Sequence, residues 1–175
     1  MKEQKIKTYN IMLSRVFPKT HPRAGQPTGF NDRVMACFRY PSYDPTLLGH
    51  KKLHTIRANY PLWKERFDEV QRGEAVINLR QWLGEPYRSK TVLLKTLTAD
   101  DGIGLQRLDF KMPDHGDLTF YVIDESMVFT TGKELSHNDG LELQDWLDWF
   151  SDYDQTQPLA IIHFTPFRYT PSIEL

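Results

Sequence analysis

The sequence contains one cysteine, Cys37, and no long hydrophobic run. A single cysteine excludes an internal disulfide and a cysteine-based zinc cluster. A membrane-spanning helix needs roughly 18 or more consecutive apolar residues, and no segment approaches that length. The first residues, MKEQKIKTYNIML, have no apolar core followed by small residues and do not resemble a signal peptide. We therefore expect a soluble, cytoplasmic protein that does not interact with a membrane.

Sequence motifs of several large enzyme classes are also missing. The chain contains no P-loop, no GxGxxG, no HExxH, no GxSxG and no CxxC. Its six histidines are scattered along the chain, which does not favour a metal site. We expect neither a metal ion nor another cofactor.

The composition fits one domain of ordinary size with an unequal distribution of charge. A chain of 175 residues, 39% of them hydrophobic, is long enough to bury roughly 70% of its unfolded surface. Residues 1–95 carry 18 Lys and Arg against 8 Asp and Glu, whereas residues 96–175 carry 4 against 15. This division either creates a basic face suited to phosphate groups or belongs to a solvated surface without a partner, which composition alone favours.

Hydrophobic periodicity predicts two helices and seven strands. Trp63, Phe67 and Val70 recur at helical spacing behind Pro61, which suits a first helical turn. The apolar residues of 143–150 form one stripe opposite acidic residues. The segments predicted as strands are Val34–Tyr40, His54–Arg57, Ala75–Trp82, Thr91–Leu97, Ile103–Phe110, Leu118–Ile123 and Leu159–Phe164.

Together these elements predict an α+β fold. Several links between strands are too short for parallel crossovers, so we expect a mostly antiparallel curved sheet or small barrel of five to seven strands, with two or three packed helices. Residues 1–40 are predicted as an N-terminal extension packed on a domain of residues 41–175, with no regular structure up to residue 33. Within the extension, residues 17–23 either lie as an arm over a cleft or cover an open sheet edge.

The densest polar cluster is GHKKLHTIRANY, residues 49–60. It places five polar side chains within seven residues: Lys51, Lys52, His54, Thr55 and Arg57. A Gly and a Lys after a turn, followed by Thr-Ile-Arg at the start of a strand, resemble the leading motif of ASCH domains, the activating signal cointegrator homology group of PUA-like folds. The block LSHNDGL at 135–141 and the strand at 160–164 resemble later parts of that family. The resemblance covers residues 48–164.

The resemblance implies a PUA-like barrel of five or six strands with a cleft for RNA or a nucleotide. From some small bacterial members it also implies an amidohydrolase that removes acyl groups from the exocyclic N4 of cytidine. In those enzymes a Lys and a Thr of the first motif act with a carboxylate of the second, which correspond here to Lys52, Thr55 and Asp139. The enzymes carry Glu at the third position, so Asp139 is one methylene shorter.

These three residues have a coherent chemistry for amide hydrolysis. The Thr55 hydroxyl is a weak nucleophile that needs a base within hydrogen-bond reach, and Lys52 can serve where burial or basic neighbours lower its pKa. Asp139 would orient Lys52 or protonate the leaving amine. Alternate strand residues point to opposite faces, so Lys52 and Thr55 can cooperate only if the strand begins near His54. Each residue also has an ordinary role, as a turn lysine, a sheet threonine or a helix cap.

The predicted binding residues lie in two segments. Arg57 shares a strand face with Thr55 and is a candidate contact for a phosphate or a base, or else an ion-pair partner for the acidic half of the chain. Basic and aromatic residues also alternate on either side of a turn at 84–86, where they either stack on a base or pack across a hairpin. The residues predicted to bind nucleic acid or a nucleotide are Arg57, His54, Lys51, Arg80, Trp82, Tyr87, Arg88 and Lys90.

Three functional hypotheses result. The first is a nucleic-acid or nucleotide-binding ASCH domain with a basic cleft, whose partner is RNA, a nucleotide or a nucleoside. The second is an N4-acylcytidine amidohydrolase that uses the same cleft. The third is a protein-interaction module whose acidic second half binds a basic partner. Phosphate binding weakens steeply with ionic strength, which separates the first hypothesis from the third, and turnover would identify the second.

Overall fold

The computed structural model describes residues 5–39, 51–111, 120–125 and 128–170. Its strands are β1 Lys7–Leu13, β2 His54–Arg57, β3 Ala75–Trp82, β4 Thr91–Leu97, β5 Gly104–Lys111, β6 Phe120–Ile123, β7 Val128–Thr130 and β8 Leu159–His163. Its helices are α1 Phe30–Arg39, α2 Tyr60–Gln71, α3 Gly132–Asn138 and α4 Leu143–Phe150, with a 3₁₀ turn, η1, at Ala99–Asp101. No helix in this described part is long and apolar enough to cross a bilayer.

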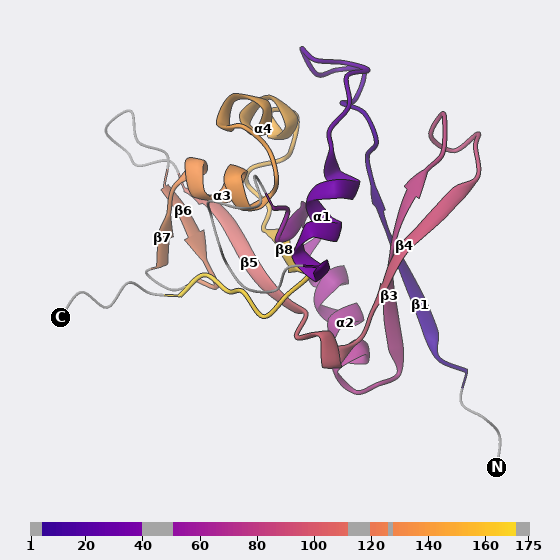
Figure 1. Cartoon of the computed structure of the whole chain (residues 1–175). Helices are drawn as coiled ribbons and strands as arrows, with labels where there is room; N and C mark the ends of the chain where they lie inside the picture. Colours follow the sequence, from indigo (N-terminus) through magenta and orange to yellow (C-terminus); the bar gives the residue numbers. More distant parts are fainter. Residues whose placement is uncertain (1–4, 40–50, 112–119, 126–127, 171–175) are drawn as a thin grey trace.

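The strands form two sheets (Figure 1). In the three-stranded sheet the order is β1-β3-β4, with β1 parallel to β3 and β4 antiparallel to it. In the five-stranded sheet the order is β2-β8-β5-β6-β7, and all neighbouring strands are antiparallel. The α+β class and the mostly antiparallel pairing are confirmed. The described strands, however, form two open sheets and no closed barrel.

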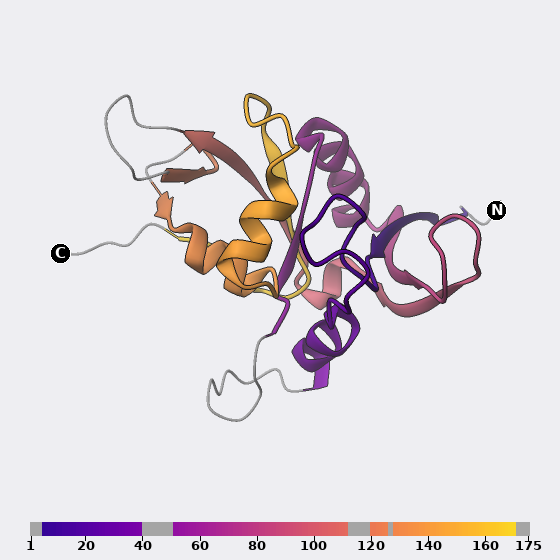
Figure 2. The ribbon, with the colours of Figure 1, turned by 90° about the horizontal axis from the view of Figure 1, so that it is seen from above.

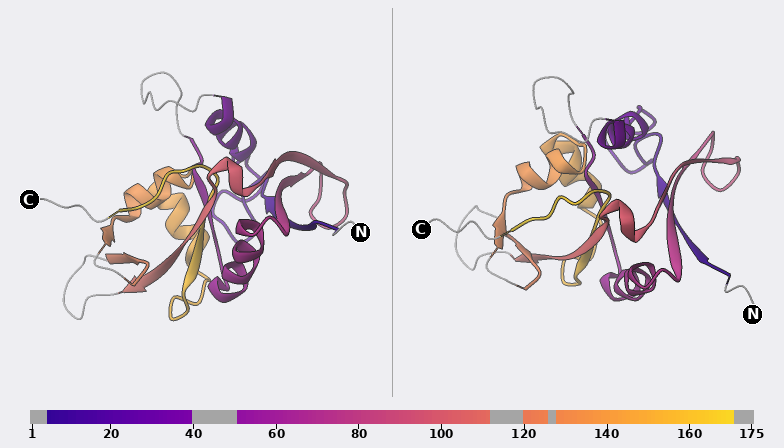
Figure 3. Two further views of the ribbon diagram at one scale, coloured as in Figure 1. Left: turned by 90° about the horizontal axis from the view of Figure 1, so that it is seen from below. Right: turned by 60° about the horizontal axis from the view of Figure 1, so that its bottom comes forward.

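Helix α2 packs against strands of both sheets, namely β3 of the first and β5 and β8 of the second. Trp63, Phe67 and Val70 form its buried face, as their spacing predicts. The helix begins after Asn59, whose side chain accepts a hydrogen bond from the backbone N–H of Leu62. Figures 2 and 3 show α1 on the opposite side of the molecule from α2.

Two predictions for the first 40 residues are wrong. The segment 34–39 is not a strand but the greater part of α1, which buries Phe30, Val34 and Cys37 at intervals of four and three residues on one helical face. Residue 40, like residues 118–119 of another predicted strand, lies outside the described part. Residues 7–13 are not irregular but form β1, whose ladder partner is about 70 residues away in the sequence.

One hydrophobic core includes residues from nearly the whole described chain. Ile11 of β1 and Val34 of α1 are buried in the same cluster as Ile77 of β3 and Ile161 of β8. Since β1 and α1 contribute to this core, the two sheets and the N-terminal residues are packed as one unit. The site described below lies where β1, β2 and the segment after α3 meet.

Candidate functional site

The backbone before β2 positions Lys52. The N–H of Lys52 donates to the carbonyl of Arg33 in α1, and the N–H of Leu53 donates to the carbonyl of Asn138 at the end of α3. Regular strand pairing then begins at His54, opposite His163 of β8. Lys52 therefore precedes the strand, which satisfies the condition under which it can share a cavity with Thr55.

Lys52 is buried and paired with Asp139. Its Nζ lies 2.5 Å from Asp139 Oδ1 and also donates to the Asp139 backbone carbonyl at 2.7 Å. The ammonium group lies 4.1 Å from the centre of the Phe30 ring, a cation–π contact. The side chains of Lys52 and Asp139 expose only 1% and 4% of their surface, so the pair is shielded from solvent.

Burial shifts the protonation of both partners toward their neutral forms. It lowers the pKa of the Lys52 amine and raises the pKa of the Asp139 carboxyl, and the attraction between the two groups opposes both shifts. His54 lies behind the pair, with Nδ1 3.9 Å from Asp139 Oδ1 and Nε2 2.8 Å from the Tyr169 hydroxyl. Burial lowers the pKa of His54 well below its usual value, which keeps the ring neutral.

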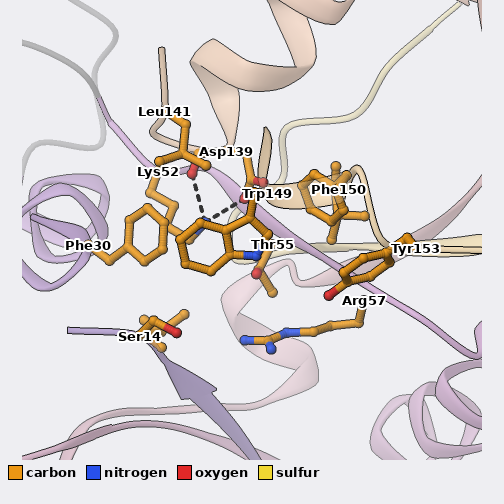
Figure 4. Close-up of a pocket in the computed structure, with 12 residues that line it drawn as sticks. Ser14, Phe30, Lys52, Thr55, Arg57, Asp139, Leu141, Trp149, Phe150 and Tyr153 are labelled. Atoms are coloured by element: carbon orange, nitrogen blue, oxygen red, sulfur yellow. Dashed lines mark hydrogen bonds and ion pairs between the residues drawn. The ribbon is translucent and has the colours of Figure 1, made fainter. Parts of the chain in front are cut away.

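A small recess contains this pair. Its volume is about 20 Å³, enough for about one water molecule and too small for a base. Lys52, Thr55, Arg57 and Asp139 all line it, as Figure 4 shows. The hydroxyl of Thr55 forms no hydrogen bond within the described part of the chain. The recess thus holds a buried acid–base pair beside a free hydroxyl.

A large groove adjoins the recess. Its volume is about 930 Å³, within the range of ligand sites in proteins. Leu13, Ser14 and Arg57 line both cavities, so the recess adjoins the groove at these residues, and we call this part of the groove its inner end. One wall is the end of β1 and the segment that follows it, and the other is the turn between β3 and β4 (Figure 1).

The turn between β3 and β4 brings two predicted aromatic residues into the groove. Trp82 is half-buried and Tyr87 is 90% exposed, and their ring centres lie 5.5 Å apart. The two rings therefore pack on each other across the turn, while Tyr87 keeps most of its surface exposed and is one of the residues that line the groove. Such a surface suits stacking on a planar ring.

The wall that follows β1 is held in place by contacts with α4. Arg23 pairs with the side chain of Asp145 in α4, and His21 Nε2 lies 3.0 Å from the Asp145 backbone carbonyl. His21 also stacks on Phe17, which lines the groove. Residues 17–19, part of the segment predicted either as an arm over a cleft or as a cover of a sheet edge, line the groove.

The remaining predicted binding residues line neither cavity. His54 is fully buried, Lys51 is half-buried at the start of the segment before β2, and Arg80 donates from Nε to the Thr91 hydroxyl. Arg88 and Lys90 are exposed on the turn between β3 and β4, where Arg88 lies 3.6 Å from Glu85. Arg88 and Lys90 follow groove-lining residues in the sequence but do not line the groove themselves.

Sequence reasoning missed several residues that form the site. Trp149 and Tyr153 line the recess, and Trp149 contacts the rings of Phe17 and Phe30. Trp149 lies beside the predicted apolar stripe of α4, where the helical pattern indicates a packing role. The place of Trp149 at the recess becomes apparent only from its contacts with Phe17 and Phe30, which are distant in the sequence.

Comparisons of this chain with models of protein families, with curated proteins and with solved structures each gave no match.

Proposed function

We propose that this protein is an ASCH-like, PUA-like protein that binds a nucleotide or a single-stranded segment of RNA in the groove. The observation that carries the proposal is the combination of aromatic and cationic groups in one cavity. Trp82 and Tyr87 offer ring surfaces at its outer end, and Arg57 offers a guanidinium at its inner end. Aromatic rings that stack on bases beside cations that contact phosphates are typical of sites for single-stranded nucleic acid.

The charge of the groove supports this proposal. Arg15, Lys19 and Arg57 line it, against one carboxylate, Glu85. This excess of positive charge attracts phosphates and makes the affinity for a nucleic acid fall with increasing salt. All three cations belong to residues 1–95, the basic half of the sequence.

Fluorescence anisotropy with a labelled, mixed-sequence single-stranded RNA tests the proposal. We expect Lys19→Gln to weaken binding and to reduce the dependence of affinity on salt, because Lys19 lines the groove. Lys64→Gln is the matched control, since Lys64 is an exposed lysine on α2 that pairs with Asp68. We expect Tyr87→Ala to weaken binding roughly 5- to 100-fold through lost stacking. Absence of binding by the wild-type protein to RNA and nucleotides alike would refute the proposal.

A second candidate function is hydrolysis of an N4-acylated cytidine. The observation that favours it is the contact between Lys52 and Asp139 in a recess that Thr55 also lines. In this reading the neutral amine of Lys52 takes the proton of the Thr55 hydroxyl as that oxygen attacks the amide carbonyl, and the same proton passes to the nitrogen of the leaving cytidine. A water molecule then hydrolyses the resulting acyl-Thr55 ester and releases the carboxylic acid. The volume of the recess requires that Trp149 or a neighbour move before an amide can enter.

Incubation with N4-acetylcytidine followed by chromatography tests this second function. We expect release of cytidine to disappear in Thr55→Val and to persist in part in Thr55→Ser, because only Ser retains a hydroxyl. Both substitutions preserve the charge of the buried pair, so the comparison does not depend on breaking it. No release at high enzyme concentration and long times would exclude hydrolysis of this amide and leave binding as the function.

A further inference from the structure

Arg57 occupies the boundary between the recess and the groove. Its guanidinium donates from Nη2 to the backbone carbonyl of Met12 at 2.6 Å, and its Nε is buried without a hydrogen-bond partner. Within the described residues this is the only hydrogen bond of the side chain, although a guanidinium carries five N–H donors. Figure 4 shows the guanidinium directed toward the side of the recess where Ser14 lies.

The charges around Arg57 do not balance. Among the described residues no carboxylate lies within 4 Å of it, and the nearby carboxylate of Asp139 is already bound to Lys52. Among the described residues, the recess is therefore lined by two basic side chains, Lys52 and Arg57, and by one acidic side chain, Asp139. A largely buried cation without a counter-charge is costly to the folded state, so its presence indicates a role in binding.

The groups near Arg57 narrow the choice of anion. Ser14 and Tyr153 place hydroxyls at the same cavity, which can donate to further oxygens of a ligand. Arg15 and Lys19 place two more cations along the groove toward Tyr87. A phosphate accepts several donors at once and matches the planar guanidinium bidentately, whereas the aromatic rings at the outer end provide surface for a base.

We infer that Arg57 anchors a phosphate group, so that the ligand of the groove is a nucleotide or a nucleic-acid strand and not a neutral nucleoside. This inference rests on the proposed function and specifies the ligand class of the same site. The phosphate lies at the inner end, at the mouth of the recess, and the base lies against Tyr87 and Trp82.

Calorimetric titration with cytidine, cytidine 5′-monophosphate, inorganic phosphate and a short single-stranded RNA tests the inference. We expect the monophosphate to bind roughly 10- to 100-fold more tightly than cytidine, as hydrogen bonds to charged groups allow. Arg57→Met should abolish this difference, and Arg57→Lys should retain part of it because the bidentate geometry is lost. Arg72→Met, on an exposed arginine paired with Glu74 outside the groove, should leave the difference unchanged.

The outcomes separate this inference from the proposed function. Equal affinity for cytidine and its monophosphate, unaffected by Arg57→Met, would overturn the phosphate anchor while nucleoside binding stands. Inorganic phosphate that binds only when Arg57 is present would support the anchor even if no nucleoside binds. A tetraglutamate peptide that binds through Arg57 as tightly as the nucleotide would overturn the assignment to phosphate. Tighter binding of RNA than of the monophosphate would support the anchor and assign the phosphate to a strand.

A stability measurement gives a second test that needs no ligand. If Arg57 is kept for binding, Arg57→Met removes an uncompensated buried cation, and we expect the urea midpoint to stay the same or to rise. If Arg57 instead serves the fold through Met12, the substitution lowers the midpoint markedly, which would overturn the inference. An Arg57→Met variant that is more stable and no longer distinguishes cytidine 5′-monophosphate from cytidine would not be expected if Arg57 had only a structural role.

Discussion

At the scale of single residues, the cost of burying Lys52 and Asp139 opposes the attraction between them. Both are almost completely buried, and each would be stable alone only in its neutral form. A buried ion pair contributes little net stability, because desolvation offsets most of the attraction. Apolar residues of similar volume would stabilise this position at least as well, so stability alone does not account for the pair.

Separating this pair should be far more costly than removing it. We expect Lys52→Met alone to lower the free energy of unfolding by about 3–5 kcal/mol, because it leaves a buried carboxylate unpaired. The double variant Lys52→Met/Asp139→Leu should recover much of that loss. Urea unfolding of the wild-type protein, both single variants and the double variant measures the coupling. Additive losses would contradict this account of the pair.

His163 should make stability depend on pH. Burial, assisted by the charge of Arg168, lowers its pKa to about 3. In the unfolded chain the imidazole titrates near 6.5, so between these values the unfolded state binds a proton that the folded state does not. The free energy of unfolding therefore decreases as the pH falls from about 6.5 toward 3, by up to about 1.4 kcal/mol per pH unit for this residue.

Urea unfolding at several pH values across that range measures the effect. His163→Gln retains a donor for the Gln106 side-chain oxygen, which accepts from His163 at 3.0 Å. Since glutamine does not titrate, we expect its stability to decrease less steeply with falling pH than that of the wild-type protein. Identical slopes for the two proteins would mean that His163 does not control this dependence.

At the scale of elements, the end of α3 determines how closely the segment before β2 approaches Asp139. Gly140 follows the helix with a φ of +75°, and a Cβ there would lie 3.0 Å from the Cβ of Lys52. Glycine is thus required by its conformation and by the contact. Any larger residue would push the Lys52 segment away from α3.

Gly140→Ala and Gly73→Ala form a matched pair for testing this requirement. Both glycines have a φ near +75°, but a Cβ at Gly73 would meet nothing within 4 Å. We expect Gly73→Ala to cost about 1 kcal/mol from backbone strain alone, and Gly140→Ala to cost more and to weaken ligand binding. Urea unfolding and RNA binding of the two variants supply the comparison. Equal losses of stability with unchanged binding would refute a special role for Gly140.

The helices and strands that could be predicted are those whose own residues show a clear pattern of hydrophobicity and turns. β3 and β4 have the predicted bounds because Ala75–Trp82 alternates buried and half-buried residues and a turn separates the two strands. The residues of α1 predict a strand because β-branched and aromatic side chains outweigh a helical spacing of only three buried positions. The residues of β1 do not predict a strand, because three of its first four residues are exposed, and only its pairing with β3 makes it a strand.

The same distinction applies to the site. The position of Lys52 just before a strand that begins at His54 follows from the local sequence. The sequence around the turn at 84–86, in contrast, leaves open whether the flanking aromatic residues stack on a base or pack across a hairpin. The groove itself does not follow, because its two walls are brought together by the parallel pairing of β1 with β3. Neither Ser14 nor Trp149 has a sequence signal that distinguishes it from an ordinary loop or packing residue.

At the scale of the whole molecule, the N-terminal residues belong to the common core. Ile11, Leu13 and Val34 are buried in it together with residues from both sheets. A chain that begins at residue 41 would expose this apolar surface and would lose one strand of the three-stranded sheet. We expect it to show no cooperative unfolding transition in urea, in contrast to the full chain. Cooperative unfolding of the shorter chain would show that residues 41–175 fold independently.

The contact of Arg23 with Asp145 also constrains when the groove can exist. The two residues are 122 positions apart, and Lys52 and Asp139 are 87 apart. During synthesis the basic wall therefore emerges long before the helix that holds it, and the lysine of the recess emerges long before its carboxylate. A partly made chain has neither wall nor pair in place. The proposed ligand binding therefore requires that the last third of the chain has been made and has folded back onto the first.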